Sequence, residues 1–330
     1  MSINKFKSMR KILKNEYGNF RAGWRILFWL GISAVSFVPF AAILKLLDIF
    51  FPDLFRSGDS NKMNSFINIV FYTGLNFALV VGSWLTLRWI DRRPYTLLGL
   101  DFNRDAITSL AKGFFLGFIN LFLVFLVLSL SGFIETRFLG IDINILISMF
   151  KYFIVFMVAA AFEETFNRGY VLQALIEGTN LWLAITIISI VFALGHANNT
   201  GFAWNNAVFF FVHGTIYSIL YVKTCSLWVP IGFHFAWNWT QGPLFGINVS
   251  GTIMENTLFS SLPEGNVLLS GGEFGAEGSL IAIIISIIFL LWLIKTNWLK
   301  PRYESYMLWK KFGINSDLLN QINNLTLRQK

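Results

Sequence analysis

"ILISMFKYFIVFMVAAAFEETFNRGY", residues 145–170, joins a long apolar run to an abrupt cluster of charges. Before Glu163, the only charged residue in this stretch is Lys151. Such a run is typical of a membrane helix, yet Glu163, Glu164 and Arg168 follow it directly. A charged side chain at the centre of a membrane helix costs roughly 2.5–3.5 kcal/mol unless it finds a partner. Three charges at this depth therefore indicate either a functional site or a structural ion pair.

The composition of the chain is typical of a membrane protein. Of its 330 residues, 55% are hydrophobic and only 13% are charged, against the ~25% charged residues of typical soluble domains. Most of its apolar segments approach the ~20 residues that a spanning helix needs. These segments cover residues 23–46, 65–90, 108–133, 143–166, 181–196, 205–223, 227–244 and 279–294. The sequence therefore predicts an all-α, polytopic integral membrane protein with about eight transmembrane helices, forming a single domain over residues 1–330.

The charges outside these segments predict the orientation, because cytoplasmic loops are enriched in Lys and Arg. These cations are frequent in a basic arm at residues 1–22, in the loop around Arg92 and Arg93, and in a tail at residues 298–330. Residues 241–278 contain glutamates and no Lys or Arg. We therefore predict that both termini are cytoplasmic, in what we expect to be a bacterial plasma membrane. The net charge of +8 then favours contact with the lipid bilayer over a nucleic-acid partner, and it predicts no particular oligomeric state.

Helix geometry separates the clustered charges into a pair and a free carboxylate. Glu164 and Arg168 are four residues apart, so they lie on one helix face and can form an ion pair. Glu163 points about 100° away from Glu164 and is not aligned with Arg168. An unpaired carboxylate in a partly wet cavity suits a general base. Alternatively, the cluster is simply the polar end of the helix, held by a structural ion pair.

Two further polar motifs lie in later apolar segments, "FALGH" at residues 192–196 and "HFAWN" at residues 234–238. Phe192 and His196 share a helix face, and so do His234 and Asn238. Donors on the latter pair could hold a developing oxyanion, or they could hydrogen-bond neighbouring helices together. Because buried polar groups need partners, and each other's side chains are the nearest, we predict that these motifs converge with the charge cluster in one site.

The three motifs in this order resemble the signature of the CPBP family of intramembrane proteases. That family includes the CAAX prenyl endopeptidases and bacterial bacteriocin-processing and self-immunity proteins, and its pattern is EExxxR, then FxxxH, then HxxxN. The resemblance covers roughly residues 156–239, within predicted catalytic core helices at residues 145–245. It departs from the family at Asn167, where relatives usually have an aromatic residue, and at Ser218, where a second glycine is common.

The resemblance implies a glutamate-type endopeptidase that acts on a membrane-associated or lipidated peptide or protein, with an active site open to the cytoplasmic side. The implied catalytic residues are Glu163, His196, His234 and Asn238, supported by Glu164, Arg168 and Phe192. Glu163 and His196 would activate a water, and His234 with Asn238 would stabilise the oxyanion. No cofactor is expected; the alternative is a zinc ion bound by Glu163, His196 and His234.

Two other functions stay open from the sequence. One is a catalytically silent membrane scaffold, or an immunity or regulatory partner protein. The other is a proton-coupled carrier that uses Glu163 and His234 as a relay, although the chain lacks the internal repeat of many carriers.

Two structural expectations complete the prediction. Counting 1.5 Å per residue, the three motifs reach a common depth most simply if the fourth helix continues past Arg168 toward Leu175. We also expect His213, in the sixth segment, to have a structural or supporting role.

Overall fold

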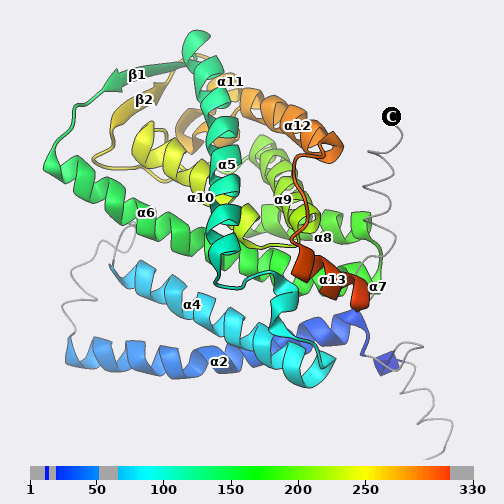
Figure 1. Cartoon of the computed structure of the whole chain (residues 1–330). Coiled ribbons are helices and arrows are strands. Elements are labelled where there is room, and N and C mark those ends of the chain that lie inside the picture. The colour runs from blue at the N-terminus through cyan, green and yellow to red at the C-terminus, as the bar shows by residue number, and fades with distance from the viewer. Residues whose placement is uncertain (1–11, 15–19, 52–65, 313–330) are drawn as a thin grey trace, which may run out of the picture.

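The computed structural model describes residues 12–14, 20–51 and 66–312, and its elements are mostly helices (Figure 1). The long helices are α2 (Ala22–Phe50), α4 (Phe66–Leu85), α5 (Arg104–Leu130), α6 (Ile143–Glu164) and α9 (Trp204–Thr224). The shorter helices are α7 (Leu172–Gly178), α8 (Leu181–Gly195), α10 (Trp228–Trp239), α11 (Val267–Ser270), α12 (Leu280–Lys295) and α13 (Tyr303–Lys311). Single turns of other helix types are η1 (Thr86–Asp91), η2 (Tyr95–Leu98), η3 (Thr165–Val171), η4 (Thr240–Leu244), η5 (Gly272–Phe274) and η6 (Ala276–Gly278).

Among the described residues, 5 helices are long and apolar enough to cross a membrane. One of these candidate spans starts in each of α2, α4, α5, α6 and α9. Helices α8 and α12 are apolar as well but shorter. The all-α, polytopic prediction is confirmed in a coarser form, as a mostly helical structure with several candidate membrane spans. Every apolar segment predicted from the sequence falls on a helix, but the count of about eight spans stays a prediction.

The fourth predicted helix does continue past Arg168. A single helical run of 36 residues extends from Ile143 to Gly178 through α6, η3 and α7. The run is π-helical over η3 and bends at Gly169, whose ψ is −115°. Such π-helical turns occur frequently at functional sites, because they re-aim the side chains on either side of them.

A small sheet was not anticipated by the all-α prediction. Strand β1 (Ile134–Phe138) pairs antiparallel with β2 (Phe259–Pro263), with Thr136 opposite Ser261. The hydroxyl groups of these two residues are 2.9 Å apart. Each strand has 5 residues and lies in a loop, so its alternation was too short to stand out in the sequence.

Close packing against α5 positions α10. A Cβ added at Gly117 in α5 would lie 2.3 Å from the carbonyl oxygen of Phe233, and one added at Gly232 in α10 would lie 2.2 Å from that of Leu110. The two backbones are therefore in contact, which small residues make possible between membrane helices. This contact fixes the helix that carries His234.

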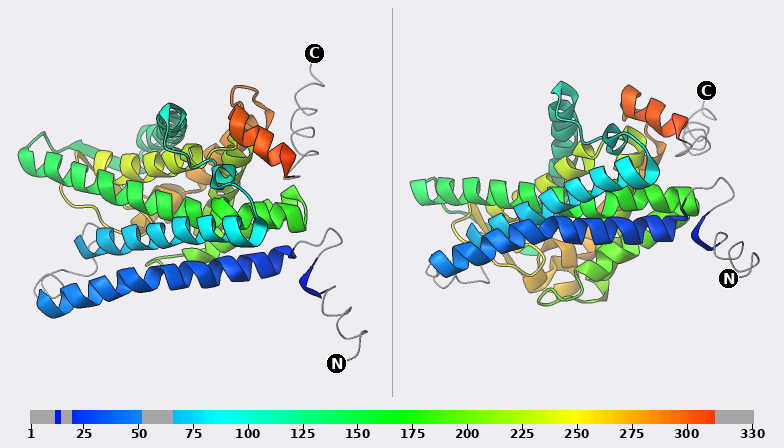
Figure 2. Two further views of the ribbon diagram at one scale, coloured as in Figure 1. Left: turned by 60° about the horizontal axis from the view of Figure 1, so that its bottom comes forward. Right: turned by 90° about the horizontal axis from the view of Figure 1, so that it is seen from below.

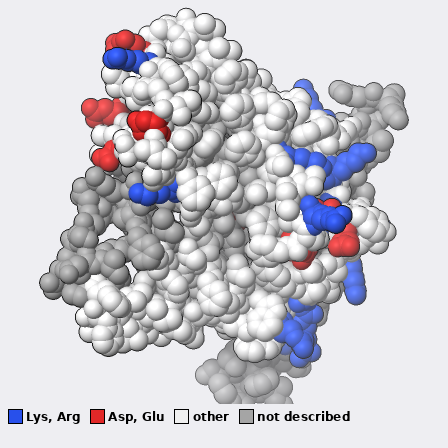
Figure 3. Space-filling view, turned by 60° about the vertical axis from the view of Figure 1, so that its left-hand side comes forward, with Lys and Arg blue, Asp and Glu red and all other residues white. Residues whose placement is uncertain are grey.

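The charges divide the molecule into two ends. The basic end contains residues 22–25, 88–104, 177–181, 223–228 and 295–312. Here Arg25 pairs with Asp91 at 2.6 Å and with Glu177 at 2.8 Å, and Arg93 pairs with Glu177 at 2.6 Å. The opposite end, the sheet end, contains residues 131–142, 196–203 and 245–279. Figure 3 shows blue cations gathered on one side of a broad white surface, and a mainly acidic group on the other. Helices α2, α4 and α6 lie side by side between the two ends (Figure 2).

Candidate active site

The predicted ion pair lies in the protein interior. Arg168 Nη1 is 3.1 Å from Glu164 Oε1, and both side chains are fully buried. The second guanidinium nitrogen, Nη2, donates to the carbonyl oxygen of Gly214 at 3.1 Å. The guanidinium also lies 4.5 Å from the ring centre of Phe192 and 5.1 Å from that of Tyr217. The pair predicted from the i, i+4 spacing is therefore confirmed, and it is enclosed by aromatic rings from α8 and α9.

His234 joins this pair through a contact that the sequence did not predict. Its Nδ1 lies 2.9 Å from Glu164 Oε1, and its ring stacks on Tyr217 with centroids 4.9 Å apart. Because the carboxylate accepts the hydrogen bond, Nδ1 carries the proton. Glu164 Oε1 thus contacts both Arg168 and His234, while Oε2 has no hydrogen-bond partner among the described residues.

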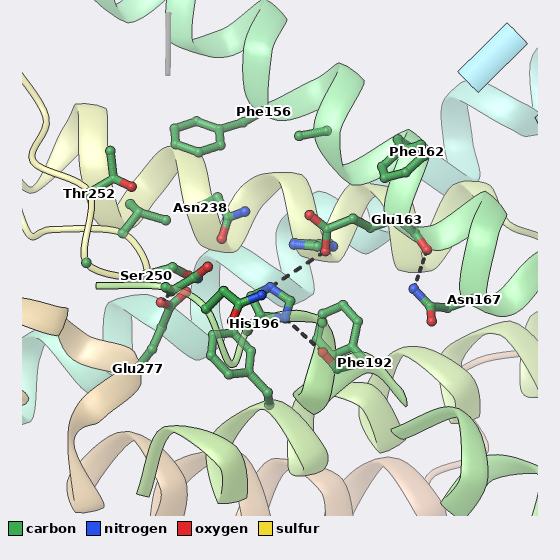
Figure 4. A pocket seen from close by; sticks show the side chains of 18 of the residues that line it. Phe156, Phe162, Glu163, Asn167, Phe192, His196, Asn238, Ser250, Thr252 and Glu277 are labelled. Atoms are coloured by element: carbon green, nitrogen blue, oxygen red, sulfur yellow. Dashed lines mark hydrogen bonds and ion pairs between the residues drawn. The ribbon is translucent and has the colours of Figure 1, made fainter. Parts of the chain in front are cut away.

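Glu163 and His196 face each other without a direct hydrogen bond. Glu163 Oε2 and His196 Nε2 are 3.8 Å apart, and their side chains are 29% and 16% exposed, respectively (Figure 4). His196 Nδ1 lies 2.8 Å from the carbonyl oxygen of Phe192. A carbonyl can only accept, so Nδ1 carries the proton, and in the neutral ring Nε2 presents a lone pair to Glu163. The Asn167 side chain donates to the backbone carbonyl of Glu163 at 2.8 Å, which helps to fix this turn.

A cavity of about 640 Å³ brings together all of the predicted catalytic residues. Glu163, His196, His234 and Asn238 line it, with Asn238 one helical turn beyond His234 on α10. Figure 4 shows Glu163, His196 and Asn238 around this cavity. Phe192 lines it as well, whereas the Glu164–Arg168 pair lies behind the wall. The predicted convergence of the motifs is therefore seen in the structure, and their chemical roles stay predictions.

The sequence did not single out Glu277, which lines the same cavity from η6. Its side chain is buried and accepts a hydrogen bond of 2.6 Å from Ser250 Oγ. Burial raises the pKa of this carboxyl from 4.5 to about 7. Ser250 has a φ of 51° in a tight turn between Val249 and Thr252, whose backbones bridge. The signal that could have found Glu277 is an acidic residue in a glycine-rich stretch, "GGEFGAEGS", directly before an apolar helix.

His213 lies outside the cavity lining. Its Nε2 is 3.0 Å from Ser286 Oγ and its Nδ1 is 3.2 Å from the Tyr217 hydroxyl, and the residue is 1% exposed. These contacts link α9 to α12 and fit the structural role expected for this histidine.

The alternative zinc site is not assembled. No group of three His, Cys, Asp or Glu side chains in residues 12–14, 20–51 and 66–312 is placed to hold a metal ion.

Comparison with known families agrees with this geometry. Residues 145–240 match the family described as Type II CAAX prenyl endopeptidase Rce1-like. This part of the chain is similar to an Rce1-like CAAX endopeptidase domain. That description names an endopeptidase, and the matched stretch contains Glu163, His196, His234 and Asn238. No curated protein and no solved structure matched the chain.

Proposed function

We propose that the protein is an intramembrane endopeptidase that hydrolyses a peptide bond of a membrane-associated or lipidated peptide, with Glu163 and His196 activating the attacking water. The observation that carries the proposal is the pair of facing acceptors in the cavity. A carboxylate oxygen and an imidazole nitrogen that presents a lone pair stand 3.8 Å apart, and two acceptors form no hydrogen bond with each other.

A water fits between these two groups by donating one proton to each of them. Its oxygen lone pairs are then free to attack a carbonyl carbon. As the new C–O bond forms, the water transfers one of its protons to Glu163. The hydrogen bond from His196 Nδ1 to the Phe192 carbonyl keeps the imidazole in the tautomer that this step needs. His196 also stacks on Phe210, with ring centroids 3.9 Å apart, which holds the ring plane.

The oxyanion of the tetrahedral intermediate would be held from α10. The Asn238 amide donates directly, and His234 donates from Nε2 in its imidazolium form, for which Glu164 is the adjacent counter-ion. When the C–N bond breaks, the proton held by Glu163 passes to the leaving amine, which gives one new carboxyl group and one new amine. Water is the only co-reactant in this balance.

In this proposal Glu164 and Arg168 are positioning residues. Arg168 fixes the carboxylate of Glu164, and Glu164 orients the ring of His234. Phe192 contributes through its ring, which contacts Arg168, and through its carbonyl group, which accepts from His196.

We further propose about eight membrane spans with both termini in the cytoplasm. The apolar helices α8 and α12 and the buried α10 supplement the long spans, and the cations at the basic end support this orientation. We place the protein in a bacterial plasma membrane.

The proposal is tested by comparing peptides from the membrane proteome and the medium, by mass spectrometry, in cells with the wild-type protein or Glu163→Gln. The matched control is Glu264→Gln, which changes an exposed carboxylate beside β2. We expect a cleavage product that disappears with Glu163→Gln, with a rate loss of roughly 10²–10⁴-fold on the purified proteins, and that persists with Glu264→Gln.

Equal product from the wild type and from Glu163→Gln would contradict the proposal. If a cellular phenotype of the wild-type protein also survived Glu163→Gln, the scaffold or immunity-partner function would be the better account. Substrate-dependent uptake into liposomes that is lost in Glu163→Gln would instead favour a carrier.

A further inference from the structure

The catalytic cavity lies at the sheet end of the molecule. His196 directly follows the last residue of α8, and the exposed Asn198 and Thr200 of the next loop line the cavity. Ser250 and Glu277, which bond each other, close it from the loops before α12. The loops that form the rim of the cavity therefore all belong to the sheet end.

Helices that begin or end at this cavity reach the basic end with their other terminus. Helix α8 starts at Leu181, close after Glu177, which pairs with Arg25. Helix α9 ends at Thr224, whose carbonyl accepts from the backbone of Arg302 at 2.8 Å. Helix α12 runs from beside Glu277 to Lys295 at the basic end. Its 16 residues span about 24 Å, close to the ~30 Å thickness of the hydrocarbon core.

A packed layer separates the cavity from the basic end. Within about two helical turns of the lining residues Asn167 and Tyr217, the chain places three buried side chains. These are Arg168, Gln173 and Tyr221, which are 0%, 1% and 0% exposed. Gln173 donates to the Tyr221 hydroxyl at 2.7 Å. Trp309 of α13 covers Tyr221 with its ring and donates to the carbonyl of Leu97 at 2.8 Å. These buried contacts lie between the cavity and the basic end, whereas the exposed rim residues Asn198 and Thr200 lie on the other side.

Cytoplasmic loops carry the excess of Lys and Arg in membrane proteins, so the basic end is the cytoplasmic one. The sequence predicted both cytoplasmic termini and a cytoplasmic opening of the site, and in this fold the two predictions conflict. We infer that the cavity opens on the extracytoplasmic side, and that the substrate is a peptide segment exposed at that face of the membrane. This inference rests on the proposed peptidase function for its substrate, and on the fold together with the distribution of Lys and Arg for its direction.

The lining of the cavity agrees with an uncharged or cationic segment. Glu163 and Glu277 supply the carboxyl groups, and no lysine or arginine occurs among the described residues that line it. A substrate carboxylate would therefore meet the like charge of Glu163, and no lysine or arginine side chain of this lining would pair with it.

The direction is testable because the chain has a single cysteine, Cys225, which is buried at the basic end. Replacing it by Cys225→Ser gives a background in which Asn198→Cys and Asn297→Cys are compared. Both asparagines are exposed, Asn198 at the cavity rim and Asn297 after α12. Each variant is treated with a membrane-impermeant maleimide in intact cells and again after permeabilisation.

We expect Asn198→Cys to be labelled in intact cells and Asn297→Cys only after permeabilisation. Labelling of Asn198→Cys only after permeabilisation would overturn the inference. Thr200→Cys replaces Asn198→Cys if the latter does not accumulate in the membrane, and it is judged by the same criterion.

Peptide cleavage is measured in the same Cys225→Ser background, with and without Glu163→Gln. Extracytoplasmic labelling without any cleavage that depends on Glu163 would contradict the peptidase function and leave the direction standing. Cleavage that depends on Glu163, together with labelling of Asn198→Cys only after permeabilisation, would contradict the direction alone.

Discussion

Arg168→Met is the substitution that most directly tests how the charges at the end of α6 are tolerated. Methionine keeps an unbranched side chain of similar length and removes the charge. In the wild type, Arg168 contacts Glu164 at 3.1 Å, with both side chains fully buried. The variant leaves the Glu164 carboxylate in the interior with His234 as its remaining hydrogen-bond partner.

The expected loss can be estimated from this geometry. Removing one partner of a buried ion pair costs about 3–5 kcal/mol, because the other charge stays buried and uncompensated. The lost contacts of the guanidinium with the rings of Phe192 and Tyr217 act in the same direction. In the double variant Glu164→Gln/Arg168→Met no charge of the pair is left. Its loss of unfolding free energy should therefore be smaller than the sum of the two single losses by roughly 1–3 kcal/mol.

The assay is unfolding by sodium dodecyl sulfate in mixed micelles, followed by tryptophan fluorescence, for the two single variants and the double variant. Arg104→Met, at an exposed position, is the matched control and should change the free energy of unfolding by less than about 0.5 kcal/mol. The double variant should stay inactive in peptide cleavage, because His234 has lost its counter-ion. A loss below about 1 kcal/mol for Arg168→Met, or strictly additive losses in the cycle, would refute the reasoning.

Three further predictions concern the residues around the site. Burial raises the pKa of Glu277 to about 7, so the stabilisation from its neutral form is fully present below pH 4.5 and is lost as the pH rises through 7. The wild type should therefore be more stable at pH 5 than at pH 8. In unfolding titrations this difference should exceed that of Glu277→Gln by on the order of 3 kcal/mol. Gly117→Ala places its Cβ 2.3 Å from the Phe233 carbonyl and should cost roughly 1–3 kcal/mol in the same unfolding assay, whereas Gly31→Ala, with nothing within 4 Å, should not destabilise. His213→Gln should lower the unfolding free energy and leave peptide cleavage within about tenfold of wild type; abolished cleavage in a folded variant would contradict its structural role.

Much of the fold could be predicted because membrane helices leave a long, redundant signal. Each apolar segment was visible from composition, and the continuation past Arg168 followed from counting residues along helices. The i, i+4 spacing of Glu164 and Arg168 is a local relation, so their ion pair could also be predicted. The motifs of the candidate site were found for the same reason, since each covers no more than six consecutive residues.

Other features depend on how distant segments pack, and no local pattern encodes that. The contact between Glu164 and His234 joins positions 70 residues apart. Glu277 enters the cavity from a glycine-rich loop whose path is fixed by contacts such as that of Gly251 N with the Phe274 carbonyl at 3.0 Å. The conflict over the direction of the opening also became visible only in three dimensions, because the sequence locates charges along the chain but not the depth at which helices meet.

The charges that interrupt the membrane helix are tolerated because they nearly cancel within one small volume. If His234 is protonated, its charge and that of Arg168 balance the carboxylates of Glu163 and Glu164. The two adjacent glutamates take different parts because a helix turns by about 100° between them. One carboxylate faces inward, fully buried against Arg168 and His234, and the other faces the cavity at 29% exposure. The inner carboxylate is therefore fixed by its partners, while the outer one keeps the access to water and substrate that a general base requires.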